Sequence, residues 1–274
     1  MEDALLTVLA EPSRDLVPRH VSPSPTQFSG RCTGRHYPRS SGEIGAARPN
    51  WHRAQDRRNE ALECELKYAL EDEAAYVRLE ESLGQPAARL QQQNLYLDVP
   101  GGNPHGSLRL RSTKNEATAE EKLYLTYKLR HAASHFVPTA YFVAEEYEAL
   151  ISRADWDAIL RSNPGERQWE LEPLKKLSEH TKRAAPCLIG GTQNLRLVYP
   201  GILPNGSVAE LDRTTFPGNR TDYELEVETD DPAPVQAWLT RRFGELGLAL
   251  RAQTKTKNQR FVEQLTALRS GSTK

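Results

Sequence analysis

The chain has 274 residues, and its 36 Lys and Arg residues are almost balanced by 37 Asp and Glu residues. Without a basic surplus it is poorly suited to gripping nucleic acid by bulk charge, so we expect no nucleic-acid partner. No run of about 18 apolar residues is present, and the sequence therefore predicts no membrane-spanning helix. The three cysteines lie far apart and match neither a zinc site nor an even set of disulfides, which favours a reducing compartment and a cytoplasmic location.

Residues 1–58 differ in composition from the rest of the chain. They hold six of the 18 prolines and no lysine, and no helical or strand period extends through them. Such a segment buries too little apolar surface to offset the entropy lost on ordering it, so we expect a disordered tail. An arginine- and serine-rich tail can also target an organelle, which is the alternative to a cytoplasmic location. The acidic start, Glu2 and Asp3, argues against that alternative.

From residue 59 onward, side chains alternate with a period of two, as is typical of half-buried strands. Seven strands are predicted, at residues 61–67, 92–98, 107–111, 123–130, 194–198, 208–212 and 223–228. Helices are predicted at residues 71–83, 144–160, 170–179 and 231–247. Glycine-rich stretches, among them 100–104 and the pair Gly190–Gly191, are predicted turns. The class is α+β, with a domain at 59–268 and a polar C-terminal fringe at 269–274.

The predicted strands carry their charges on one face, sorted by sign. One strand offers only Arg109 and Arg111, and another offers Glu224, Glu226 and Glu228. Like charges two residues apart on one strand repel each other unless a counter-ion lies between them. Two architectures fit: a sandwich with solvated charged faces, or a closed sheet whose charged faces line a wet interior. The sorting by sign favours the closed sheet.

The sorted side chains suit a polyanion together with a divalent cation. Carboxylate oxygens are hard ligands of the kind that Mg²⁺ and Mn²⁺ prefer. Paired guanidinium groups match the oxygens of a phosphate in a bidentate way. A three-glutamate strand alone is more often a solvated edge, but cationic and anionic strands in one domain together indicate a phosphate site with a metal.

The order of these motifs resembles the CYTH domain, or triphosphate tunnel metalloenzyme family. Residues 63–67 match its E-x-E-x-K signature, and residues 92–98 match its second-strand pattern, with Asn94 in place of an acid and Leu97 in place of Phe. The later motifs follow in order along the chain, so that the resemblance covers residues 59–265. They are the R-x-R strand at 109–111, the strand ending at Lys128, the central Arg196, the E-L-D strand at 210–212, the E-x-E-x-E strand at 224–228 and the S/T-K-x-x-R-F element at 256–261.

The resemblance implies a closed eight-stranded antiparallel β-tunnel with flanking helices, which binds a triphosphate and a divalent metal, Mg²⁺ or Mn²⁺. It assigns phosphate binding to Lys67, Arg109, Arg111, Lys128, Arg196 and Lys257. Lys255 lies two residues from Lys257 and is the alternative to it. The expected metal ligands are Glu63, Glu65, Asp212, Glu224, Glu226 and Glu228. The expected catalytic residues are Glu63, Glu65, Lys67, Glu226 and Glu228.

The expected activity is metal-dependent hydrolysis of a triphosphate, with inorganic tripolyphosphate as the first hypothesis for the substrate. The resemblance leaves three alternatives: a thiamine-triphosphatase, an adenylate cyclase of the CYTH type and a polyphosphate- or nucleotide-binding module without turnover. The many carboxylates argue against the last one, since binding alone does not need them. We expect a small-molecule partner and a monomer or homodimer.

Overall fold

The computed structural model describes residues 61–101, 106–130, 141–181 and 183–271. These residues belong to one compact unit that comprises residues 51–274. The predicted disordered tail at 1–58 lies outside the described residues. Among the described residues, no helix combines the length and the apolar character that a membrane crossing requires.

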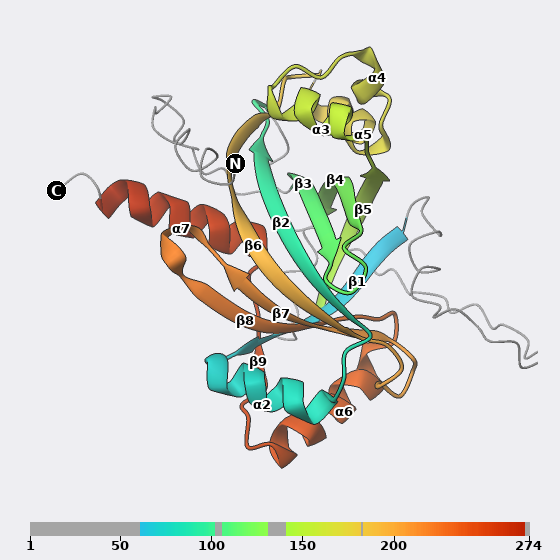
Figure 1. Cartoon of the computed structure of the whole chain (residues 1–274), viewed down its shortest axis with the longest axis vertical. Helices are drawn as coiled ribbons and strands as arrows, with labels where there is room; N and C mark the ends of the chain where they lie inside the picture. Colours follow the sequence, from blue (N-terminus) through green and yellow to red (C-terminus); the bar gives the residue numbers. More distant parts are fainter. Residues whose placement is uncertain (1–60, 102–105, 131–140, 182, 272–274) are drawn as a thin grey trace, which may run out of the picture. The chain divides into compact units, whose positions relative to one another are not determined.

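Eight antiparallel strands close into a barrel, as the sequence predicted (Figure 1). They are β1 (Ala61–Leu70), β2 (Ala88–Asp98), β3 (Gly106–Asn115), β4 (Glu121–Arg130), β5 (Tyr141–Leu150), β6 (Cys187–Tyr199), β7 (Val208–Thr215) and β8 (Thr221–Glu228). Their order around the barrel is β1–β8–β7–β6–β2–β3–β4–β5, and β5 pairs with β1 to close it. A two-residue strand, β9 (Arg251–Ala252), adds to β1.

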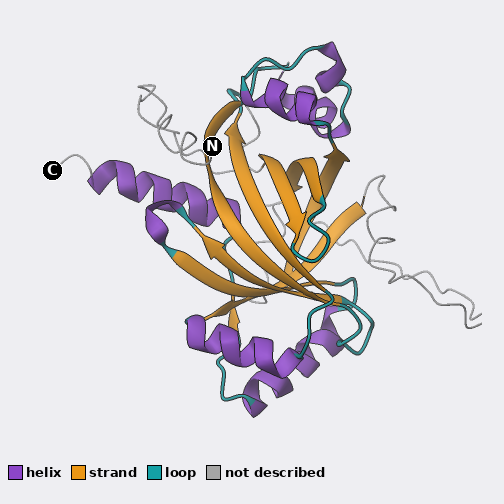
Figure 2. Ribbon diagram, in the orientation of Figure 1, coloured by secondary structure: helices purple, strands orange, loops and turns teal. Residues whose placement is uncertain are grey.

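Helices flank the barrel on its outside (Figure 2). They are α2 (Glu73–Leu83), α3 (Arg153–Leu160), α4 (Glu166–Trp169), α5 (Glu172–Thr181), α6 (Pro232–Glu245) and α7 (Lys257–Gly271), with a 3₁₀ turn, η2 (Pro217–Asn219). The carboxylate of Asp72 caps α2 by accepting a hydrogen bond from the Ala75 amide at 2.8 Å. Helix α6 begins at Pro232, where a missing amide hydrogen costs nothing. The last helix ends three residues beyond the predicted domain limit at Leu268.

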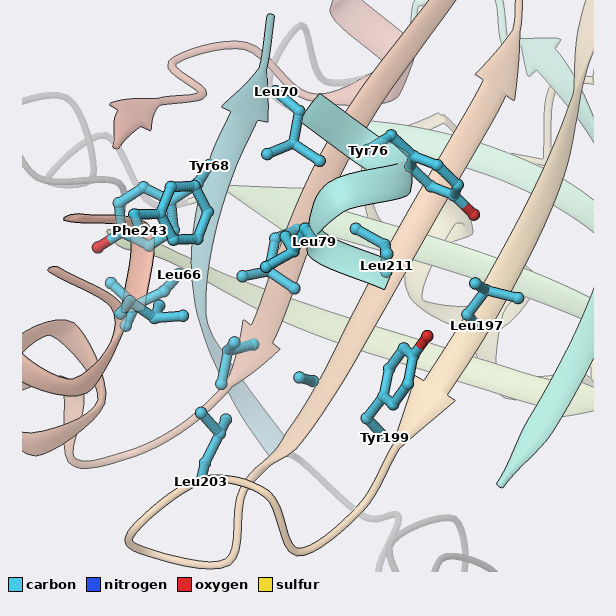
Figure 3. Close-up of a cluster of buried hydrophobic side chains, with 14 of the residues drawn as sticks. Leu66, Tyr68, Leu70, Tyr76, Leu79, Leu197, Tyr199, Leu203, Leu211 and Phe243 are labelled. Carbon is cyan, nitrogen blue, oxygen red and sulfur yellow. The ribbon is translucent and has the colours of Figure 1, made fainter. Parts of the chain in front are cut away.

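The apolar cores lie between the outer face of the barrel and these helices. In one core, Leu66 and Leu211 from the strands pack with Leu79 of α2 and Phe243 of α6 (Figure 3). In a second core, strands β3 and β4 pack against α3 and α5. Because side chains alternate across a strand, apolar residues on the outside place the charged residues inside the barrel. The fold therefore gives the sorted charges a shared interior.

The predicted helix at 144–160 is wrong over its first half. Residues 141–150 form β5, and helix α3 begins only at Arg153. Strand β5 joins β4 to β1 and supplies the eighth strand of the barrel. Residues 131–140, which precede it, lie outside the described part of the chain.

The predicted turn at Gly190–Gly191 is also wrong, because both glycines lie inside β6. A Cβ atom at Gly190 would lie 2.9 Å from the Phe261 ring, and one at Gly191 would clash with the Asn94 carbonyl oxygen of β2. The register between β2 and β6 shifts at this point, between Tyr96 and Leu97. The glycines mark a close approach at a β-bulge.

Candidate functional site

One cavity inside the barrel is lined by side chains from all eight barrel strands and from the start of α7. The lining residues are Glu63, Glu65, Lys67, Tyr96, Ser107, Arg109, Arg111, Thr126, Lys128, Phe142, Val143, Ala144, Glu146, Arg196, Glu210, Glu226, Glu228, Thr256, Lys257 and Asn258. Every site residue predicted from the sequence is among them except Asp212 and Glu224. Those two are fully buried and contact the lining residue Lys257. The structure thus brings the predicted residues together.

Three of the predicted metal ligands form a cluster, which we call the acid trio: Asp212, Glu224 and Glu226. Each offers a carboxylate oxygen, and these oxygens lie within 4.8 Å of one another. The Lys257 ammonium contacts all three, at 2.8 Å from Asp212 Oδ2 and 2.7 Å from Glu226 Oε1. Arg196 adds a bidentate pair with Asp212, at 2.9 and 2.6 Å. Lysine and arginine side chains of the protein therefore compensate the negative charge of the acid trio.

The protonation of two members of the acid trio, Asp212 and Glu226, follows from these contacts. Burial alone would raise the pKa of Glu226, but Lys257, Lys67 and Arg196 outweigh it and hold this pKa well below its usual range. Burial is likewise outweighed at Asp212, whose pKa is lowered by Arg196 and Lys257. A carboxylate surrounded by ammonium and guanidinium groups stays ionised at neutral pH.

A second group of cavity carboxylates is less well compensated, and we call it the open acid set: Glu63, Glu65, Glu210 and Glu228. Burial raises the pKa of Glu63, Glu65 and Glu210, and neighbouring carboxylates raise it further. Glu228 is exposed at the end of β8, and partial burial together with Glu210 and Glu146 raises its pKa. Glu65 and Glu228 are direct cross-strand partners in the β1–β8 register. This set is where a further positive charge would relieve the most repulsion.

A lysine bridges two carboxylates at the β1 and β5 side of the cavity. Lys128 Nζ lies 2.6 Å from Glu63 Oε2 and 2.8 Å from Glu146 Oε2. Although burial would raise it, the pKa of Glu146 is lowered to about 2 by Lys128 and Arg109. One lysine therefore cannot compensate both acids fully, and Glu63 is the one left with a raised pKa.

The β3 wall of the cavity carries surplus positive charge. Arg109 donates to the Thr126 hydroxyl at 3.3 Å and lies 3.8 Å from Glu146. Arg111 donates through Nε to the Asn94 side-chain oxygen at 2.8 Å. Burial and the charges of Arg109 and Arg196 together lower the pKa of Arg111 to about 10, against the opposing charges of Glu148 and Glu146. Two closely spaced guanidinium groups, one held by an amide and the other by a hydroxyl and a more distant carboxylate, are suited to an anion with several oxygens.

Helix α7 enters the site through its first turn. Besides Lys257, its Arg260 donates to Asp222 at 2.8 Å and to Glu224 at 2.6 Å. The ring of Phe261 stacks on Tyr96 with centroids 4.8 Å apart. Lys255, the sequence alternative to Lys257, is instead half exposed and pairs with Glu263 at 2.8 Å.

Sequence analysis missed Glu146, because its strand was predicted to be a helix. A signal was nevertheless present: Phe142, Ala144, Glu146 and Glu148 alternate along residues 142–148 and share the inner face of β5. Glu210 and Arg260 lay within quoted motifs but received no role.

This combination of fold and lining defines a class of protein, an antiparallel barrel that encloses a cavity with one cationic wall and many carboxylates. The family model described as the CYTH domain matches residues 61–262 of the chain. The chain therefore belongs to the CYTH family, as the sequence motifs indicated.

Solved structures agree with this assignment. HpAC1 from Hippeastrum, described as a putative adenylyl cyclase with a dominant triphosphatase activity, superposes with a TM-score of 0.64 and 25% identity, over 74% of this chain and 96% of that one. A putative adenylate cyclase from Bacillus halodurans gives a TM-score of 0.54 at 22% identity, over 74% of this chain and 99% of that one, and shows the shared fold. The comparison with curated proteins gives no significant match.

Proposed function

We propose that this CYTH protein hydrolyses a triphosphate inside its barrel and that inorganic tripolyphosphate is the substrate. The observation that carries the proposal is the β3 wall, where Arg111 is held by the neutral Asn94, Arg109 lies 3.8 Å from Glu146, and both face a cavity rich in carboxylates. The dominant triphosphatase activity in the description of HpAC1 supports the same reaction at 25% identity. No aromatic wall dedicated to an organic group is evident among the lining residues, which favours the inorganic substrate.

The phosphate-binding groups of the proposal surround the cavity. Arg109 and Arg111 bind oxygens of the anion from one wall, and Lys67, Lys128, Arg196 and Lys257 line the remainder. Lys67 is fixed by Glu226 at 2.6 Å and by Glu65 at 2.9 Å. Burial would lower the pKa of Lys67, but Glu226 and Glu65 outweigh it and raise this pKa. The ammonium therefore stays charged, as an anion site requires.

The donor chemistry of the open acid set fits Mg²⁺ or Mn²⁺, since its carboxylates are hard ligands lacking full compensation. We place the metal at Glu63, Glu65 and Glu228. A bound divalent ion would neutralise charge on the phosphate oxygens and lower the pKa of a water molecule. Of the other predicted ligands, Asp212 holds Lys257 and Arg196, and Glu224 holds Lys257 and Arg260. Glu226 holds Lys67 and Lys257.

The chain's own residues then have defined tasks in the hydrolysis. The guanidinium and ammonium groups orient the triphosphate and offset the charge that develops on its oxygens. Glu210, the member of the open acid set that is not among these metal ligands, has a pKa raised by burial and accepts a proton from the attacking water at its carboxylate. Oxygen of that water bonds to the terminal phosphorus as the bridging P–O bond breaks, which yields phosphate and diphosphate.

A side-by-side assay tests this proposal. Purified protein with Mg²⁺ or Mn²⁺ is given tripolyphosphate, thiamine triphosphate or ATP, and released phosphate, diphosphate and cyclic AMP are measured. We expect phosphate release from tripolyphosphate at the highest kcat/KM, and none with metal removed by EDTA. Cyclic AMP from ATP would instead support the adenylate cyclase, and preferred hydrolysis of thiamine triphosphate would support the thiamine-triphosphatase. Binding without turnover would indicate the non-catalytic module.

We also propose the type of partner, the cellular location and the oligomeric state of the protein. A small-molecule substrate with no protein or nucleic-acid component fits a cavity enclosed by the barrel strands. The cytoplasmic location and the monomeric or homodimeric state rest on the sequence, and fractionation and light scattering test them.

A further inference from the structure

Arg111 is held in the cavity by a neutral group. Its Nε donates to Asn94 Oδ1 at 2.8 Å. Among the described residues, no carboxylate lies within the 4.0 Å of an ion pair with Arg111. Asn94 is fully buried and stands directly opposite Arg111 in the β2–β3 register. The half-buried guanidinium is therefore held in place without a carboxylate in direct contact, and Glu148 and Glu146 act on it only from a longer distance.

Arg196, on the strand at the other side of β2, is held in the opposite way. It forms a bidentate pair with Asp212 and a further bond of 2.6 Å to Glu226. Both arginines line the same cavity, but carboxylates neutralise one of them and an amide supports the other. Whether an amide or a carboxylate contacts an arginine thus decides how much of its positive charge is left uncompensated and can attract an anion.

We propose that Asn94 is a positioning residue that fixes Arg111 without neutralising it, so that its charge remains available to the triphosphate. The inference rests on the proposed function and extends it to a residue beyond the cavity lining. An aspartate has nearly the same shape as an asparagine, and it would hold Arg111 equally well. Its negative charge would, however, compete with phosphate oxygens for the same guanidinium.

The side-chain amide of Asn94 leaves one of its polar atoms without a hydrogen bond. With Oδ1 engaged by Arg111, Asn94 Nδ2 is buried without a partner. The hydroxyl of Thr192, the cross-strand neighbour of Asn94 on β6, is buried and unpaired as well. An aspartate in the same place would instead form an ion pair with Arg111, and a charge-assisted bond is stronger than the bond to a neutral amide. Asp would therefore suit the folded protein at least as well, while Asn serves anion binding.

The test measures affinity and stability on the same variants. Tripolyphosphate is titrated calorimetrically into wild type, N94D, N94A and Q93E in EDTA, so that no turnover occurs, and the Tm of each is recorded. Gln93 is the exposed neighbour of Asn94 on the outer face of β2, so Q93E adds the same charge outside the barrel. We expect N94D to bind about tenfold to a hundredfold more weakly at an equal or higher Tm. N94A should lose less affinity but have a lower Tm, and Q93E should match wild type.

Opposite signs of affinity and stability are the signature that a merely structural role would not give. N94D binding as tightly as wild type, or failing to fold, would overturn the inference. So would N94A weakening binding as much as N94D, because that would show that lost support rather than added charge is responsible. Wild-type protein that neither binds tripolyphosphate in EDTA nor hydrolyses it with Mg²⁺ would overturn the proposed function, and this inference with it.

Discussion

At the scale of single residues, the site depends on which charge each side chain meets. Lys257 and Lys255 are two residues apart, yet Lys257 lies buried among three carboxylates and Lys255 pairs with Glu263 at the surface. An ammonium in the middle of the acid trio occupies the position that a metal ion would need. As long as Lys257 remains there, the acid trio anchors the first turn of α7 instead of binding a metal.

The two lysines offer a matched pair of variants. Lys257→Met removes the internal cation and leaves the acid trio uncompensated, so we expect K257M to bind one more Mn²⁺ ion than wild type. Lys255→Met should leave the number of bound ions unchanged. Electron paramagnetic resonance of free Mn²⁺ during a titration counts the ions. An unchanged stoichiometry in K257M would show that the trio does not attract a divalent cation.

The residues of the site, but not their pairing, could be predicted from the sequence. Alternation along a strand fixes which side chains share a face, and so Glu63, Arg109 and Glu226 were correctly expected in one interior. Which cation meets which acid depends on strands far apart in sequence. Lys257 meets Asp212 across 45 positions, a relationship that no local pattern contains.

At the scale of elements, local helix propensity gave a wrong prediction where pairing that closes the barrel determines the secondary structure. The stretch A-E-E-Y-E-A-L at 144–150 is rich in good helix formers, yet it lies in β5. Pairing with β4 and β1 satisfies its backbone on both sides, and this outweighs the small helix propensities. Glycines inside β6 similarly serve a bulge that only the neighbouring β2 and α7 require. The amphipathic helices α2 and α6 depended less on distant partners and were predicted correctly.

At the scale of the whole molecule, the barrel keeps its apolar cores outside and an unbalanced charge inside. The open acid set has raised pKa values in the folded state, chiefly through burial. The folded protein holds these protons more tightly than the unfolded chain does. The protonated glutamates of the open acid set therefore contribute their full stabilisation below the ordinary pKa of 4.5. This stabilisation is lost as the pH rises through their higher pKa values in the folded protein.

Asp212 and Glu226 of the acid trio give the opposite dependence. Asp212 and Glu226 have lowered pKa values, so their contribution is present above the ordinary values of 3.8 and 4.5 and is lost only in acid. We expect the Tm of metal-free protein to fall between about pH 5 and about pH 8, and Mg²⁺ to raise it more at the higher pH. Differential scanning calorimetry with and without Mg²⁺ measures both. A metal-free Tm that rises over this range would contradict the assignment of the open acid set.

The most direct measurement is a crystal structure of the protein with Mn²⁺ and imidotriphosphate, whose P–N–P bridges resist hydrolysis. Anomalous scattering locates the Mn²⁺ ions independently of the anion. The account predicts the triphosphate chain against Arg109 and Arg111, with Mn²⁺ at Glu63, Glu65 and Glu228 and Lys257 still seated in the acid trio. An anion bound outside the barrel, or Mn²⁺ in the trio with Lys257 displaced, would contradict it.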